Sequence, residues 1–215
     1  MHEYAEILKY KSTDQGTMLV VMVPDKDLGD YLRRFAKDGK VSTELRIDDP
    51  RYISNEQRKK ARALIGDIAL HTGFEANFLH DLMKLYYCIH SGEDEFSLSN
   101  CSMTTARHYI SYLIEFCFEW DIPLADSGLD RTDDIGKYLW LCIKFKKCSL
   151  CGKPADVHHV QAIGMGMDRK TYDDINHEKI ALCREHHTIA HQTGWDTFSK
   201  KYKVYGVRYV NTKEL

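Results

Sequence analysis

The residue types that bind metal ions gather in one stretch of the sequence, between residues 148 and 191. Cys148 and Cys151 are separated by two residues, and Cys183 and His186 have the same gap. Each pair fits a tight turn, and two such turns bring together four ligands that suit tetrahedral zinc. The spacing therefore predicts a structural zinc site made of these four side chains.

Four further histidines in this stretch offer a second kind of site: His158, His159, His187 and His191. His187 and His191 are four residues apart, so one face of a helix can present both rings. His158 and His159 are adjacent, and adjacent side chains of a strand point to opposite faces. One of these two can therefore bind a metal ion while the other acts as a base.

Alternative roles stay open for several of these histidines. His158 and His159 could serve the zinc site, although the two paired turns already complete a tetrahedron. His191 could be an ordinary histidine on a helix surface. His186 and His187 could exchange roles, because consecutive residues of a helix point about 100° apart.

The pattern from Cys148 onward resembles the HNH endonucleases, whose active site is a hairpin and a helix around one divalent ion. The likeness covers residues 145–202, and the spacing is also similar to phage-encoded HNH proteins of recombination clusters, to the RecA-dependent Ref nucleases and to the DNase colicins. This resemblance implies a metal-dependent DNA endonuclease. It makes His159 the general base that takes a proton from water, with His158, His187 and His191 as ligands of the catalytic ion.

The sequence does not choose the catalytic ion. Mg2+ or Mn2+ is expected for such a nuclease, with Ni2+ or Zn2+ as alternatives, because imidazole accepts all four.

The sequence departs from the HNH pattern at one position, the middle asparagine. The nearest candidate, Asn176, lies seven residues before Cys183, which is farther than the pattern requires. Arg169, in a glycine-containing loop after the His pair, is either a phosphate clamp or part of a surface turn.

The elements that position this stretch are predicted from apolar periodicity. Residues 137–147 alternate as a strand that leads to Cys148, and a short closing helix follows Gly194. Ser54 and Gln57 form a capping box at the start of a long helix, and Ser102 caps another. The remaining predicted elements are strands over 3–11, 18–23, 41–47 and 204–210, a short helix over 28–37, and a helix over 74–89 whose inward residues are Phe74, Phe78, Leu82, Leu85, Tyr86 and Ile89.

The predicted fold class is α+β, with an N-terminal domain at residues 1–123, a linker at 124–136 and a C-terminal domain at 137–215. The first domain has a small sheet and three main helices, and the second is a ββα-metal HNH domain with a zinc knuckle. Charge supports the division, because residues 137–215 hold 14 Lys and Arg against 8 Asp and Glu (+6), which leaves 16 against 24 (−8) before them. A basic C-terminal module fits a polyanionic substrate.

The front half resembles the NinB-type recombination proteins of phages over residues 15–123. The likeness lies in the segment from Asp48 to Ser54 and in the helix that opens from Ser102 to Arg107. It implies a homodimer that acts on single-stranded or branched DNA, together with a single-stranded-DNA-binding protein or a recombinase. Arg107 is then a candidate DNA contact, as are Lys200 and Lys201 near the C-terminus, and the alternative for each is a solvated helix face.

Composition excludes several other classes of protein. No apolar run reaches membrane-spanning length and the start lacks a secretory signal, so we expect a cytoplasmic protein, in the host cell if it is phage-encoded. The cysteines are then reduced, and Cys88, Cys101, Cys117 and Cys142 are expected to be buried thiols. A zinc hydrolase of small substrates is disfavoured because no Glu adjoins the His pair. The main alternative to a nuclease is a non-catalytic, zinc-stabilised DNA-binding recombination mediator.

Overall fold

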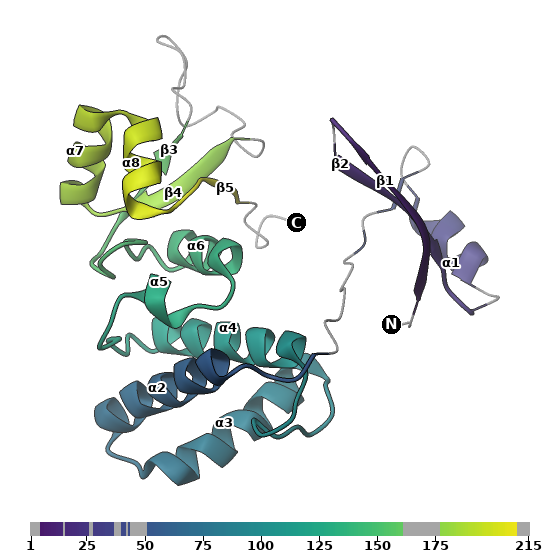
Figure 1. Cartoon of the computed structure of the whole chain (residues 1–215), viewed down its shortest axis with the longest axis horizontal. Coiled ribbons are helices and arrows are strands. Elements are labelled where there is room, and N and C mark those ends of the chain that lie inside the picture. Colours follow the sequence, from purple (N-terminus) through teal and green to yellow (C-terminus); the bar gives the residue numbers. More distant parts are fainter. Residues whose placement is uncertain are drawn as a thin grey trace. The chain divides into compact units, whose positions relative to one another are not determined.

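The computed structural model divides the chain into two units, residues 1–47 and 48–215. The described residues are 5–14, 16–25, 28–36, 40, 41, 43, 51–160 and 177–209. The strand expected over 41–47 falls almost wholly outside them, as do Arg169 and Asn176. A mixed fold of helices and small sheets confirms the predicted α+β class (Figure 1).

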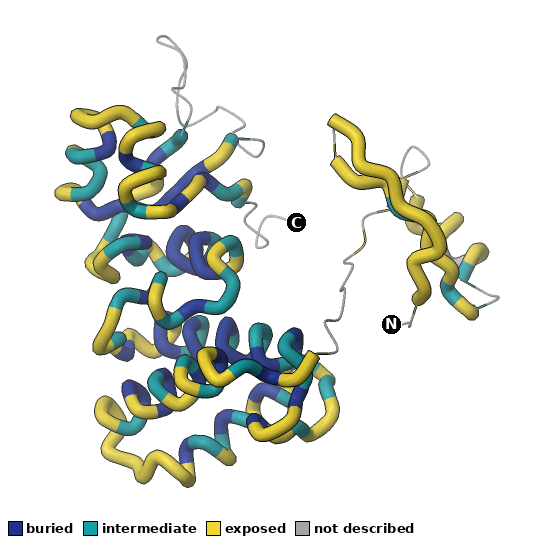
Figure 2. Tube along the Cα trace, in the orientation of Figure 1, coloured by how far each residue is buried: buried dark blue, intermediate teal, exposed yellow. Residues whose placement is uncertain are grey.

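The first unit contains a hairpin and one helix. Strand β1 (Glu6–Thr13) pairs antiparallel with β2 (Gly16–Met22), and α1 spans Leu28–Phe35. The Thr13 hydroxyl donates to the Gly16 carbonyl across the turn, at 2.7 Å. Figure 2 shows that the hairpin is exposed along both strands.

The second unit begins with three long helices: α2 (Asn55–Thr72), α3 (Ala76–Ser91) and α4 (Met103–Glu119). The predicted capping box is present, because the Ser54 hydroxyl accepts from the Gln57 amide and the Gln57 side chain accepts from the Ser54 amide. Gly73 ends α2 in the left-handed conformation, with φ 77°, which glycine adopts without a steric penalty. The Ser102 hydroxyl caps α4, as predicted.

The predicted inward face of α3 is wrong. The buried residues of this helix are Leu79, Met83 and Tyr87, whereas Phe78 and Ile89 are exposed. Both sides of the helix are apolar, so periodicity alone could not decide which side packs inward.

The predicted strand over 137–147 is also wrong, because residues Ile135–Lys144 form helix α6. The Asp134 carboxylate accepts from the Lys137 amide and starts the helix. This helix packs against α4 on one side and against the sheet on the other, so most of its positions are apolar. The sequence therefore lacks the spacing of apolar and polar residues that marks a helix with one buried face. The four-residue helix α5 (Gly128–Arg131) precedes α6, and a Cβ at Gly128 would collide with the ring of Tyr138 on α6.

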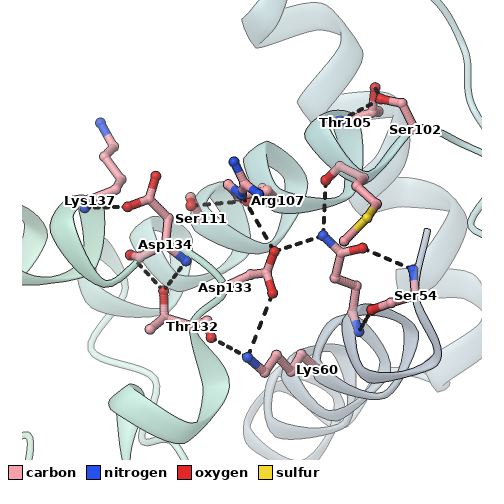
Figure 3. A network of polar contacts seen from close by, with 12 residues as sticks. Ser54, Lys60, Ser102, Thr105, Arg107, Ser111, Thr132, Asp133, Asp134 and Lys137 are labelled. Atoms are coloured by element: carbon pink, nitrogen blue, oxygen red, sulfur yellow. Dashed lines mark hydrogen bonds and ion pairs between the residues drawn. The ribbon is translucent and has the colours of Figure 1, made fainter. Parts of the chain in front are cut away.

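Asp133 joins the segment before α6 to the helical layer (Figure 3). Its carboxylate accepts from Gln57 Nε2 at 2.7 Å and lies 3.8 Å from Lys60 Nζ and 3.6 Å from Arg107 Nε. Gln57 Nε2 also donates to the Met103 carbonyl, at 2.9 Å. Residues 124–136 are thus packed against α2 and α4, while the independent folding of residues 1–123 and 137–215 stays a prediction.

The C-terminal elements form a small sheet with helices on both sides. Strand β4 (Glu178–Leu182) lies between β3 (Asp156–His159) and β5 (Val207–Arg208), and both pairings are antiparallel. Helices α7 (Arg184–Thr193) and α8 (Trp195–Tyr202) follow β4, while α6 packs between β4 and α4. One hydrophobic core therefore runs from α2 to α8, with its most buried parts in α4, α6 and β4 (Figure 2). No described helix is both long and apolar enough to cross a membrane.

Candidate metal centres

The first Cys pair lies in a tight turn between α6 and β3. The Gly152 amide donates to the Cys148 carbonyl at 2.9 Å, and the Cys148 amide donates to the Lys153 carbonyl at 2.7 Å. Gly152 has φ +69°, a conformation in which a side chain would be strained. The turn brings the Cys148 and Cys151 thiols to the same side, as the two-residue gap predicts.

The second pair begins helix α7. Cys183 occupies the N-cap position, and its carbonyl accepts from the His187 amide at 2.8 Å. The two pairs are held together by Ser149, whose amide donates to the Ala181 carbonyl of β4 at 2.9 Å. The sheet and the first turn of α7 thereby fix the second pair against the first.

The four predicted zinc ligands come together with tetrahedral dimensions. Cys151 Sγ lies 3.7 Å from Cys183 Sγ, and His186 Nδ1 lies 3.5 Å from Cys148 Sγ and 3.3 Å from Cys183 Sγ. Zn–S and Zn–N bonds of about 2.3 and 2.0 Å in a tetrahedron give ligand separations of roughly 3.8 and 3.5 Å. The observed distances therefore fit a four-coordinate zinc ion, and the burial of Cys148 and Cys183 is typical of a structural site.

The protonation of these thiols also indicates a metal site. Burial and, to a smaller extent, the neighbouring Cys148 and Cys183 thiols together raise the pKa of Cys151 to about 12. For Cys183, burial raises the pKa, but the His186 amide and the neighbouring thiols outweigh it and lower the net value. Because thiols this close repel one another once ionised, a divalent cation is the partner that keeps them together as thiolates.

The cysteines outside this cluster are mostly the buried thiols that the sequence predicts. Cys101, Cys117 and Cys142 are buried and Cys88 is half-buried. Burial raises the pKa of both Cys117 and Cys142 to about 12, so neither is a thiolate at neutral pH.

Three of the four remaining histidines form a second cluster. The ring centre of His158 on β3 lies 4.8 Å from that of His187 and 5.0 Å from that of His191, and the two rings on α7 lie 4.8 Å apart. Three imidazoles that share one ion through bonds of about 2.1 Å have ring centres roughly 4.5 Å apart in octahedral and 5.2 Å apart in tetrahedral geometry. The histidine triad (His158, His187 and His191) therefore fits one ion and leaves coordination positions for other ligands.

Burial keeps two of the three rings of the triad in their metal-binding form. His158 is 7% exposed, and burial lowers its pKa to about 4, with further contributions from His187 and His191. Burial also lowers the pKa of His187. Both rings are therefore neutral at pH 7, with a nitrogen lone pair available for an ion.

His159 lies apart from the triad on the opposite side of β3. It pairs with Lys179 of β4, whereas His158 pairs with Ile180. Directly paired residues share a face of a sheet, so His159 and Lys179 lie on the face opposite to the one that carries His158 and Ile180. Lys179 is only 5% exposed, and the sequence pattern did not identify this buried cation beside His159.

Helix α8, which the sequence predicts only as a short closing helix, supports both clusters with aromatic rings. Trp195 lies 5.9 Å from the ring of His158, and Tyr202 lies 5.8 Å from the ring of His186. Phe198 lies between them in the chain and is fully buried. The spacing of residues 195, 198 and 202 along one helical face is the signal that could have predicted this role.

The predicted DNA contacts are dispersed. Arg107 lies in the α2–α4 layer and pairs with Asp133, which gives it a structural role there. Lys200 and Lys201 are exposed on α8, and the ammonium group of Lys201 lies 5.1 Å from the ring centre of Tyr202.

Comparison with known proteins identifies one family. The family model described as "Putative HNHc nuclease" matches residues 26–215. No curated protein and no solved structure matches the chain.

Proposed function

The chain belongs to the HNHc nuclease family, and we propose that it is a metal-dependent endonuclease that hydrolyses DNA phosphodiester bonds. The single observation that carries this proposal is the histidine triad, with His159 on the opposite side of the same strand. A zinc module that only binds DNA has no use for a second cluster of metal ligands.

In this proposal the triad holds the catalytic ion. His158, His187 and His191 provide three nitrogen ligands and leave room for a phosphate oxygen and water. The ion, when bound, stabilises negative charge on the phosphate and on the leaving 3′ oxygen. Mg2+ and Mn2+ are the ions we expect for such a nuclease, and Ni2+ and Zn2+ are the alternatives that three imidazole ligands favour.

His159 acts as the general base. A neutral imidazole can accept a proton from the attacking water. Neighbouring residues of a strand point to opposite faces, so one ion cannot easily bind both His158 and His159. The ligand and base roles are therefore separated by the backbone.

The zinc cluster supports the catalytic centre without taking part in the reaction. His186 belongs to this cluster and His187, the next residue of α7, belongs to the triad. Zinc at the start of α7 fixes the rotation of the helix about its own axis. That rotation decides where the His187 and His191 rings point.

The direct test is incubation of the full chain with labelled duplex, single-stranded and branched DNA in the presence of Mg2+ or Mn2+. We expect cleavage that stops when EDTA is added, and none from a His159→Ala variant purified in parallel, which controls for contaminating nucleases. DNA binding without cleavage under any divalent ion would favour the zinc-stabilised recombination mediator.

The finer predictions from the sequence concern the biological setting. A phage origin, a NinB-like front half, a role in recombination and an association with a single-stranded-DNA-binding protein or recombinase all stay predictions. Among the candidate DNA contacts, Lys200 and Lys201 are better placed than Arg107, because they are exposed and carry positive charge on the C-terminal unit.

A further inference from the structure

Helix α3 has a second apolar face in addition to the one that packs into the core. The buried face consists of Leu79, Met83 and Tyr87. The other face, here called the α3 stripe, consists of Phe78, Leu82, Leu85 and Ile89. These four residues are separated by four, three and four positions, which places them in one line along the helix.

Most of the α3 stripe is open to solvent. Phe78 is 53% exposed, Leu85 51% and Ile89 70%, while Leu82 is half-buried. Phe74 extends the stripe at its N-terminal end, because its ring centre lies 5.9 Å from that of Phe78. A row of large apolar side chains of this length is unusual on the surface of a monomer and marks an interaction site.

The charges beside the stripe are compensated within the helix. Asp81 Oδ1 lies 3.1 Å from both Lys84 Nζ and His80 Nδ1. These contacts leave no excess of positive charge on α3 beside the stripe that would favour nucleic acid. The chemistry of the stripe fits an apolar, helical partner.

We propose that the α3 stripe is a homodimer interface, in which α3 packs antiparallel against α3 of a second copy of the chain. The four-three-four spacing is that of helices that pack side by side in a coiled coil. In an antiparallel pair about a two-fold axis, Phe78 faces Ile89 of the second copy and Leu82 faces Leu85. The same patch then serves both copies, as the symmetry of a dimer requires.

The area of the stripe matches what a stable dimer needs. Its exposed side chains, together with Phe74 and Tyr86, offer roughly 500–600 Å² of apolar surface per copy, as estimated from their exposed fractions and typical side-chain areas. A standard interface buries about 800 Å² per partner, and about 65% of a homodimer interface is apolar. The stripe, together with Phe74 and Tyr86, therefore accounts for the apolar part of such an interface, and the inference does not depend on nuclease activity.

The test is sedimentation of the full chain over a range of concentrations. We expect a dimer for the wild type, and a dissociation constant raised by about 100-fold or more in Phe78→Glu and in Ile89→Lys, because each variant buries an unpaired charge in the interface. Asn77→Glu is the matched control, since it places a charge on α3 outside the stripe and is expected to leave the dimer intact. Unchanged zinc content and helix signal in all variants show that folding is retained.

A mixing experiment tests the antiparallel arrangement. Phe78→Glu and Ile89→Lys chains, each monomeric alone, are expected to form a mixed dimer, because the two substituted positions carry opposite charges and face each other across the interface. A wild-type protein that stays monomeric at all concentrations, or stripe variants that dimerise as the wild type does, would overturn the proposal. A dimer that is lost in both variants but not restored by mixing would overturn the antiparallel pairing.

Discussion

His186 and His187 are consecutive residues of α7 that belong to different ligand clusters. His186 Nδ1 faces the Cys148 and Cys183 thiols at 3.5 and 3.3 Å, while the His187 ring lies 4.8 Å from that of His158. The turn of about 100° between neighbouring helical residues sends the two rings in different directions. The two centres are therefore coupled through a single peptide unit.

Loss of a zinc ligand is expected to destabilise the C-terminal part of the chain. Cys151→Ser should lower the zinc content below one ion per chain and reduce the free energy of unfolding by several kcal/mol, because structural zinc contributes directly to folding. Metal analysis and thermal unfolding measure both effects. Cys88→Ser, outside the cluster, is the control, and an unchanged zinc content in Cys151→Ser would exclude this ligand set.

Removal of the proposed base is expected to stop cleavage without affecting metal binding. His159→Ala should lower the cleavage rate by about 10²–10⁴-fold while zinc content, folding and DNA binding stay near wild type. Raising the Mn2+ concentration should not restore activity, because no ligand is missing. His71→Ala, on the exposed side of α2, controls for the loss of a histidine, and wild-type cleavage by His159→Ala would refute the assignment.

Removal of a triad ligand is expected to give a different result. His158→Ala should weaken binding of the catalytic ion, so that cleavage falls at low Mn2+ and recovers in part when Mn2+ is raised. Titration of cleavage rate against Mn2+ for this variant and for His159→Ala separates a ligand from a base. The same Mn2+ dependence in both variants would contradict the separation of roles.

The low pKa of His158 predicts a dependence of stability on pH when the triad holds no ion. The pKa of about 4 in the folded protein lies below the unfolded value near ~6.5, so the unfolded chain takes up the proton first as pH falls. Between pH 7 and pH 5 this group should therefore reduce the free energy of unfolding by about 2 kcal/mol. His158→Gln should show a correspondingly smaller loss over the same pH range in chemical denaturation, and an equal loss would argue against the buried, neutral ring.

The carboxylate of Asp133 is expected to stabilise the contact between the helical layer and the segment that leads to α6. Asp133→Ala leaves the side chains of Gln57, Lys60 and Arg107 without this acceptor, and should reduce the free energy of unfolding by about 1–3 kcal/mol. Asp130→Ala, at an exposed position of α5, is the control.

Limited proteolysis of both variants between residues 124 and 136 also tests whether the two predicted domains, residues 1–123 and 137–215, fold independently.

Local signals in the sequence predicted the site better than they predicted the packing. The two-residue gaps and the capping box depend on neighbours in the chain, and the structure brings Cys148 and Cys151 together with Cys183 and His186 as expected. The sequence of α6 favours a strand because the helix is buried on two sides and has no clear apolar stripe, although Asp134 caps its start. Three features depend on contacts between segments that are distant in the chain, and the spacing of apolar residues in a single sequence does not reveal such contacts. They are the inward face of α3, the position of Lys179 beside His159 and the aromatic support from α8.

The order of layers in the second unit separates α3 from the metal centres. The sheet, α6, α4 and α3 follow one another across the unit (Figure 1), and each packing step spans about 10 Å. In a dimer joined through α3, three such steps in each copy and one between the two α3 helices would separate the two sheets by about 70 Å, and the triads lie beyond the sheets. That distance is about 20 base pairs of B-DNA at roughly 3.4 Å each. Such a spacing cannot serve two directly opposed phosphates of one duplex, and instead suits incisions about two helical turns apart or on two separate DNA arms.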